Sequence, residues 1–169
     1  MIHRDSLSKT SLSTGVAYLR TNNFIEDSKL ALSSNRLSEA QFGINHGRRI
    51  GGSFLNIDLG MQDGIGAFDA QANRNPRPGQ PDARYHKYTA TVSYLYPFKL
   101  WGESLSFSSL MTGQHSEDVL FSPQRMSLGG QSSIRGYKDQ SLSGDSGGYL
   151  IRSRASWKLL TARERLFGR

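Results

Sequence analysis

Apolar and polar residues alternate with a period of two along five segments of this chain. The clearest is residues 53–62, where Leu55, Ile57 and Leu59 face one way and Asn56 and Asp58 face the other. Because successive side chains of a β-strand point to opposite sides, this alternation predicts a strand with two chemically different faces. The same pattern predicts strands at residues 10–18, 40–46, 88–96 and 105–111. The chain therefore holds about five to six strands.

The connections between these segments alternate between short and long. Short ones lie at residues 47–52 and 97–102, and long ones at 22–35 and 64–85. Antiparallel strands with this arrangement, each about ten residues long, are typical of an outer-membrane barrel. Aromatic residues near strand ends suit the interfacial girdles of such a barrel: Tyr85, Tyr88, Tyr94, Tyr96, Phe98 and Trp101. We therefore predict an all-β antiparallel meander that forms part of a transmembrane β-barrel.

A soluble β-sandwich also has alternating strands, so a soluble basic all-β binding module is the alternative. The polar face of a sandwich would carry many charged residues, whereas here it carries mostly Ser, Thr, Asn, Gln and Gly. That composition favours a water-filled or plugged lumen. Five to six strands are fewer than the eight or so of the smallest single-chain barrels, so we expect an unclosed barrel fragment.

Charge and composition exclude several function classes. The net charge is +7, but residues 151–169 hold six Lys and Arg and one Glu. Most of the positive charge therefore lies in a C-terminal tail. A nucleic-acid surface would spread its basic residues over one folded face, and we expect no nucleic-acid partner. The chain has no Cys, and its His residues lack metal-ligand spacing, so we expect no metal and no cofactor. The polar start predicts no signal peptide.

One string resembles an enzyme motif. Residues 144–148 read Gly-Asp-Ser-Gly-Gly, the sequence around the nucleophile of chymotrypsin-like proteases. That chemistry needs a His base and an orienting Asp beside the Ser. None of His3, His46, His86 and His115 stands in the matching sequence context. We interpret the string as a turn that leads into a strand, and we expect no enzyme activity.

The most specific string is Gly129-Gly130 followed by Ile134-Arg135-Gly136-Tyr137. Gly permits the positive φ of a tight loop, and the Arg guanidinium stays charged even when partly buried. Together with Gln114-His115-Ser116, Pro123-Gln124 and the run after Tyr137, this string resembles the transporter subunits of two-partner secretion, the hemolysin secretion/activation proteins of Gram-negative outer membranes. The resemblance covers about residues 1–150.

The resemblance implies a fold, a function and site residues. It implies periplasmic domains ahead of a 16-stranded barrel that exports and activates a large hemolysin-, adhesin- or toxin-type exoprotein, with outer-membrane lipid as a second partner. Residues 1–115 would be central barrel strands, and residues 116–150 an extracellular loop folded into the lumen, with the Arg135-Gly136-Tyr137 tip. Arg135 would pair with an acidic residue of the wall, for which Asp58 is the candidate here. An outer-membrane insertase, which shares this loop motif, is a more distant alternative.

The match weakens after Leu150. Residues 151–169 are treated as a divergent basic tail, and residues 159–167 suit a short helix better than a strand. A reading-frame change or truncation is one hypothesis for such a tail. The fragment alone is then expected to be inactive.

Overall fold

The computed structural model describes residues 2–25, 28–29, 35–68, 70–71, 79–129, 141–145 and 148–157. Nearly all of this is strand. In chain order the elements are β1 (His3–Arg4), β2 (Ser8–Thr21), β3 (Phe24–Ile25), β4 (Ser28–Lys29), β5 (Asn35–Ile50), β6 (Ser53–Ile65), β7 (His86–Leu100), β8 (Glu103–His115), the 3-10 turn η1 (Ser122–Gln124), β9 (Met126–Gly129), β10 (Ser141–Gly144) and β11 (Gly148–Trp157).

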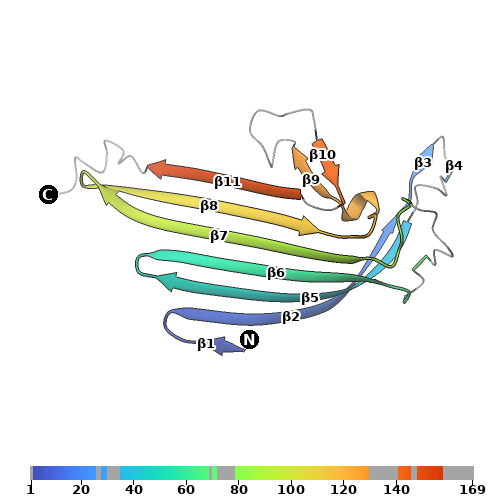
Figure 1. The fold of residues 1–169 in the computed structure, drawn as a ribbon, viewed down its shortest axis with the longest axis horizontal. Helices are drawn as coiled ribbons and strands as arrows, with labels where there is room; N and C mark the ends of the chain where they lie inside the picture. Colours follow the sequence, from blue (N-terminus) through green and yellow to red (C-terminus); the bar gives the residue numbers. More distant parts are fainter. Residues whose placement is uncertain are drawn as a thin grey trace.

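Seven strands form one antiparallel sheet in the order β1-β2-β5-β6-β7-β8-β11 (Figure 1). The pairs β3–β4 and β9–β10 form two small separate sheets in the long connections. All five strands expected from the alternation are present, and each is longer than its alternating segment. Because β1 and β11 are the outermost strands of the described sheet, the sheet is open, as predicted.

Two of the hairpins close through two-residue turns at the same end of the sheet. Gly51-Gly52 joins β5 to β6, and Trp101-Gly102 joins β7 to β8. Trp101 and Gly102 have φ values of 53° and 80°, as tight hairpin turns require. We call this end the short-turn end, and the opposite end, where residues 22–34, 66–85 and 116–147 connect strands, the long-loop end.

Register sorts the side chains onto two faces. Ser11, Asn45, Asp58, Thr91 and Thr112 stand opposite one another in one row across five strands. The next row along each strand points the other way and holds apolar residues: Leu12, Ile44, Leu59, Ala90 and Gly113. We call these sides the polar face and the apolar face.

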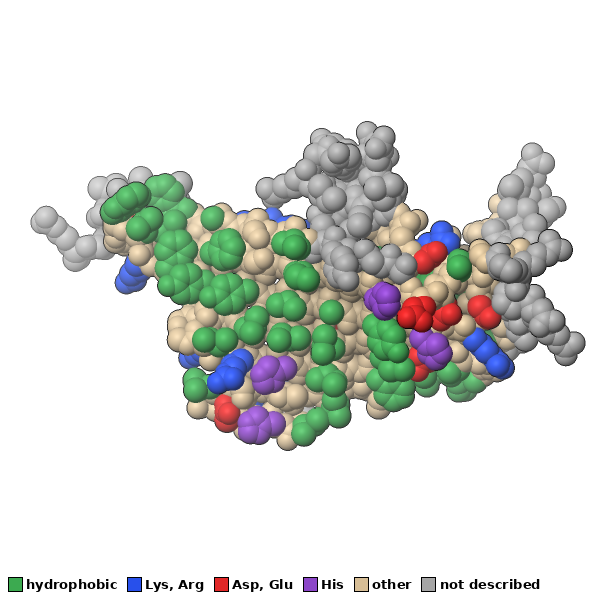
Figure 2. Space-filling view, viewed as in Figure 1, with side chains coloured by type: hydrophobic (Ala, Val, Ile, Leu, Met, Phe, Trp, Pro, Cys, Tyr) green, Lys and Arg blue, Asp and Glu red, His purple; other side chains and the backbone are tan. Residues whose placement is uncertain are grey.

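The apolar face is uncovered. Val16, Phe42, Leu59 and Ile151 are 60%, 52%, 46% and 66% exposed. Figure 2 shows hydrophobic side chains spread across this face, with charged side chains gathered at its two ends. In the described part of the chain no second sheet packs against it, so the arrangement is not the β-sandwich considered as the alternative.

Buried apolar residues are few and lie at the long-loop end. Within the described ranges they are Leu37, Ala83, Tyr85 and Leu120. They belong to β5, to the connection before β7 and to the connection after β8. We also find, among the described residues, no helix with the length and apolar character needed to cross a membrane.

Strand β11 runs through the boundary that we set at residue 150. Its ten residues pair with β8, from Gly148 opposite Gln114 to Trp157 opposite Leu105. Arg152 and Arg154 therefore belong to the polar face of the sheet and not to a detached tail. The alternation of Ile151, Ser153 and Ala155 with these arginines is a pattern typical of a strand. The helix expected at residues 159–167 lies outside the described residues.

Candidate functional site

One row of the polar face consists of uncharged and mostly small residues. The row reads Ser13, Gly43, Gly60, Thr89 and Gln114 from β2 to β8. A Cβ added at Gly43 would lie 2.5 Å from Ser13 Oγ, and one added at Gly60 would lie 2.5 Å from Thr89 Oγ1. The hydroxyls thus occupy the space above the glycines, and the surface is a smooth wall of hydrogen-bonding groups that suits contact with water.

The segment that follows β8 folds onto this face at the long-loop end. Lys87 Nζ, on the polar face of β7, donates to Gln124 Oε1 of η1 at 2.7 Å. Gln114 Nε2, on the polar face of β8, donates to the carbonyl oxygens of Gln124 at 3.0 Å and Asp145 at 3.4 Å. Both side chains are buried, with exposed fractions of 7% and 8%. The described parts of the 116–150 loop are therefore fixed to the wall by buried hydrogen bonds, which are costly to break.

The base of the loop is closed by its own contacts. Arg125 forms an ion pair with Asp145, and its Nε donates to the carbonyl oxygen of Leu120 at 3.0 Å. Between them β9 and β10 pair, with Ser127 opposite Ser143. The loop is thus a hairpin whose two arms are held together where they leave the wall.

Ser116 and Asp118 fix the start of the loop. Ser116 Oγ donates to the carbonyl oxygen of His86 at 2.8 Å, and the backbone N–H of His86 donates to Asp118 Oδ2 at 2.8 Å. The first residues after β8 are therefore bonded to the first residue of β7 through both backbone groups of His86.

Glu39 is a buried carboxylate on the polar face of β5, only 5% exposed. It accepts hydrogen bonds from the Tyr85 hydroxyl and, at 3.0 Å, from Gln41 Nε2. Burial, and then the bond to Glu39, raise the pKa of Tyr85 well above its ordinary value, so its hydroxyl remains a donor. The Lys87 ammonium interacts electrostatically with Glu39. Glu39 thus links the connection before β7 to the wall that holds the loop.

Gly64 makes this arrangement possible. Its N–H donates to the carbonyl oxygen of Tyr85 at 2.8 Å. A Cβ at this position would lie 2.0 Å from the carbonyl oxygen of Ala83 and 3.0 Å from the backbone N of Tyr85. Only a residue without a side chain allows the 83–85 segment to lie directly on β6.

The site residues expected from the sequence are only partly within the described ranges. Gly129 ends β9. Gly130, Ile134, Arg135, Gly136 and Tyr137 lie outside the described residues. Asp58 is on the polar face, as expected, where its Oδ2 accepts from Asn45 Nδ2 at 3.1 Å. Its pairing with Arg135 stays a prediction.

Sequence reasoning missed the buried polar network of Glu39, Tyr85, Lys87, Gln114 and Gln124. The sequence places Tyr85 in an aromatic girdle, but Tyr85 is 1% exposed and its hydroxyl donates to Glu39. Glu39 and Tyr85 are 46 residues apart, so no local spacing joins them. The one available signal is a Glu and a Lys near the long-loop ends of their strands, away from the other charged residues of the polar face.

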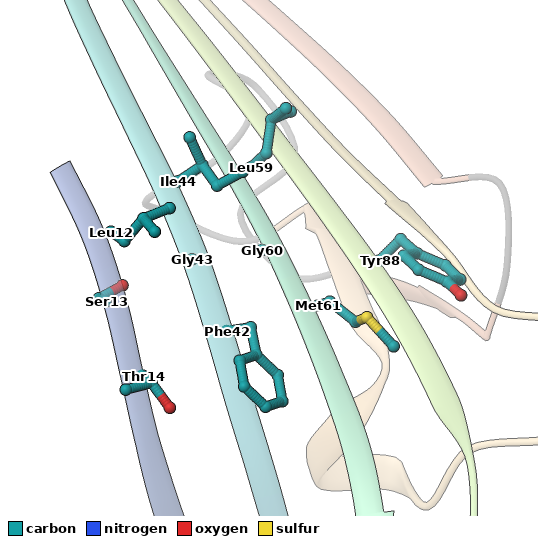
Figure 3. A pocket seen from close by; sticks show the side chains of 10 residues that line it. All are labelled: Leu12, Ser13, Thr14, Phe42, Gly43, Ile44, Leu59, Gly60, Met61 and Tyr88. Atoms are coloured by element: carbon teal, nitrogen blue, oxygen red, sulfur yellow. The ribbon is translucent and has the colours of Figure 1, made fainter. Parts of the chain in front are cut away.

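The apolar face has an open groove. Figure 3 shows the row of Leu12, Ile44 and Leu59 on one side of Gly43 and Gly60, with Phe42, Met61 and Tyr88 on the other. The groove has a volume of about 590 Å³. Gly43 and Gly60 belong to a row directed to the polar face, so the floor of the groove is backbone, and its walls are mostly apolar.

Solved structures with a similar fold come from outer-membrane transporters. The chain superimposes on CdiB from Escherichia coli with a TM-score of 0.87 and 28% identity, over 95% of this chain and 29% of that one. CdiB from Acinetobacter baumannii, at 22% identity and a TM-score of 0.79, shares the fold. The open sheet therefore corresponds to a part of a transporter barrel, which confirms the predicted fold class.

The sequence relatives are also transporters. The outer membrane transporter CdiB of Dickeya dadantii is 30% identical over 159 residues, which is 94% of this chain and 28% of the relative. The hemolysin transporter protein HpmB of Proteus mirabilis is 33% identical over 145 residues, which is 83% of this chain and 25% of HpmB. The chain thus spans little more than a quarter of the length of these relatives.

The family assignment rests on nearly the whole chain. Residues 1–165 match the family described as haemolysin secretion/activation protein ShlB/FhaC/HecB, so the match passes through β11 and beyond residue 150. Sequence, fold and family agree, and the chain belongs to the ShlB/FhaC/HecB family of haemolysin secretion/activation proteins.

Proposed function

We propose that this chain forms a central part of the wall of an outer-membrane pore that exports a large exoprotein by two-partner secretion. The observation that carries the proposal is a single-layer sheet with an uncovered apolar face and a polar face to which a loop is bonded. A wall between lipid and an aqueous lumen needs this pairing of faces.

Lipid is the proposed partner of the apolar face. The main strands have 10 to 16 residues, enough to cross a bilayer at a tilt. At the short-turn end this face carries the aromatic residues Tyr94, Tyr96, Phe98, Phe107 and Trp157, and the rings of Tyr96 and Phe98 stack at 5.6 Å. Aromatic rings in this position suit the membrane–water interface. The groove over Gly43 and Gly60 has the polarity and size to take a lipid acyl chain.

The two edges of the sheet imply further strands in the working pore. In hydrocarbon each unpaired backbone N–H or C=O costs several kcal/mol, so an open edge is not tolerated. Strands on the outer sides of β1 and β11 would pair these edges, and the family resemblance implies sixteen strands in all.

The loop tip is the proposed working part of the pore. Gly129 and Gly130 would shape its start, and Ile134, Arg135, Gly136 and Tyr137 would form the tip that reaches into the lumen. A guanidinium in a confined lumen needs a carboxylate partner, and Asp58 is exposed on the polar face. The hydrogen bonds of Lys87 and Gln114 would hold the base of the loop in place while the tip acts.

Export of hemolysin by a chimera tests this proposal. In the HpmB chimera, the segment of HpmB that matches this chain is replaced by this chain. Charge-assisted hydrogen bonds contribute about 1.5–3 kcal/mol, so we expect Arg135→Ala to lower haemolysis by culture supernatants roughly tenfold or more. Heat-modifiable migration of the barrel on gels should be unchanged.

Arg84→Ala, at an exposed position in the connection before β7, is the control and should export normally. Normal export by Arg135→Ala would contradict the role of the tip. A chimera that assembles in the membrane but never exports hemolysin would contradict the proposed function itself.

A further inference from the structure

Basic side chains gather on the polar face at the short-turn end. The register places there a group from five strands that we call the basic belt: Arg4, Lys9, Arg49, Lys99, Arg152 and Arg154. All six residues are exposed. Arg48 is next to Arg49 in the sequence, so its side chain points to the opposite side of the sheet, the apolar face.

Few carboxylates oppose this charge. In the described strands the acidic residues of the polar face are Glu39 and Asp58. Glu39 lies at the long-loop end and is bonded to Tyr85 and Gln41. Asp5, in the turn between β1 and β2, accepts hydrogen bonds from the backbone N–H groups of Leu7 and Ser8, and these bonds keep its pKa well below the ordinary value. The belt therefore has a net positive charge.

Five of the six belt residues border two neighbouring hollows. One, of about 500 Å³, is bordered by Arg4, Lys9 and Arg49, together with Asp5 and Arg48. The other, of about 550 Å³, is bordered by Arg152 and Arg154. Phe54 and Asn56 border both.

Between them the two hollows are lined by residues of every strand from β1 to β11 in the large sheet. An aromatic contact orients one of the belt guanidinium groups. The Arg49 guanidinium lies 4.8 Å from the centre of the Phe54 ring. A guanidinium that contacts an aromatic face keeps N–H donors at its edge for a planar anion.

We propose that the basic belt binds an acidic segment of a polypeptide as it enters the lumen from the short-turn end. Four of the six side chains are arginines, whose donors match carboxylates two at a time. The ligand is a polypeptide and not a lipid headgroup because the belt lies on the face that holds the loop, opposite the apolar face. This inference rests on the proposed function, since it requires that the polar face lines a pore.

Current through the HpmB chimera in a planar bilayer tests the inference. Poly-L-glutamate added at the short-turn side should block the current at low salt, and poly-L-lysine should not. The block should weaken as salt rises, because at physiological salt charges are screened beyond about 8 Å. Since exposed ion pairs are individually weak, the combined variant Arg49→Gln, Arg152→Gln, Arg154→Gln should need roughly tenfold more poly-L-glutamate for the same block.

Arg20→Gln, at an exposed position on the apolar face of β2 near the long-loop end, is the control and should leave the block unchanged. Heat-modifiable migration shows that every variant has assembled. Equal block by both polymers, or an unchanged block in the combined variant, would contradict binding of an acidic segment by the belt. The proposed pore function would not be affected by that result. An equal loss of block in Arg20→Gln would show that net charge alone is responsible, and would overturn the belt. A chimera that assembles but carries no current would contradict the proposed function, and with it the belt.

Discussion

Replacing Glu39 by Ala should lower the free energy of unfolding of the HpmB chimera by about 3–5 kcal/mol, the usual cost of removing one partner from a buried charged network. Glu39 is 5% exposed, and its loss would leave the buried Tyr85 hydroxyl without its acceptor. The Lys87 ammonium would also lose its negative neighbour. Guanidinium unfolding in lipid vesicles, followed by tryptophan fluorescence, measures the change.

Two variants separate the buried network from charge in general. Glu39→Gln keeps an acceptor for Tyr85 and should cost less than Glu39→Ala. Glu117→Ala removes an exposed carboxylate at the same end of the sheet, and it should change the free energy of unfolding by no more than about 0.5 kcal/mol. Equal effects for Glu117→Ala and Glu39→Ala would show that Glu39 does not organise the long-loop end.

Gly64→Val should detach the 83–85 segment from β6. The new Cβ would overlap the backbone carbonyl of Ala83, and backbone cannot rotate away as a side chain can. Overpacking of this kind costs about 1–3 kcal/mol, and relief requires the segment to move, together with Tyr85. Trypsin cleavage at Arg84, which is exposed beside the segment, should become markedly faster.

Gly15→Val is the matched control, because Gly15 is on the same face in β2 and a Cβ there meets nothing within 4 Å. It should leave cleavage at Arg84 unchanged. Cleavage at the unmodified rate in Gly64→Val would contradict the close packing of the 83–85 segment on β6.

The strands and their two faces could be predicted because they depend on a local property. In residues 53–62 the polarity of each side chain predicts which face of the sheet it lies on. The strand register in the structure agrees with that prediction across β2, β5, β6, β7 and β8. By contrast β1, with two residues, is too short for any alternation to be recognised.

The contacts that organise the site could not be predicted in the same way. Glu39 with Tyr85 and Lys87 with Gln124 join residues 46 and 37 positions apart, which only the strand register brings together. Charge summed over residues 151–169 places Arg152 and Arg154 in a basic tail. Assigned to alternate positions of β11, the same residues lie with Arg49 on one face.

Single-cysteine labelling along β6 tests the central claim, that one face of this sheet contacts lipid and the other an aqueous lumen. The chain has no Cys, so each introduced thiol is the only one contributed by this segment. In the assembled chimera, cysteines at Asn56, Asp58 and Gln62 should react with a charged, water-soluble maleimide, and those at Ile57, Leu59 and Met61 should be protected from it. Spin labels at the second set should be relaxed by oxygen dissolved in the bilayer. Equal labelling at both sets, or protection of Ile57, Leu59 and Met61 from both water and lipid reagents, would contradict a membrane wall with two faces.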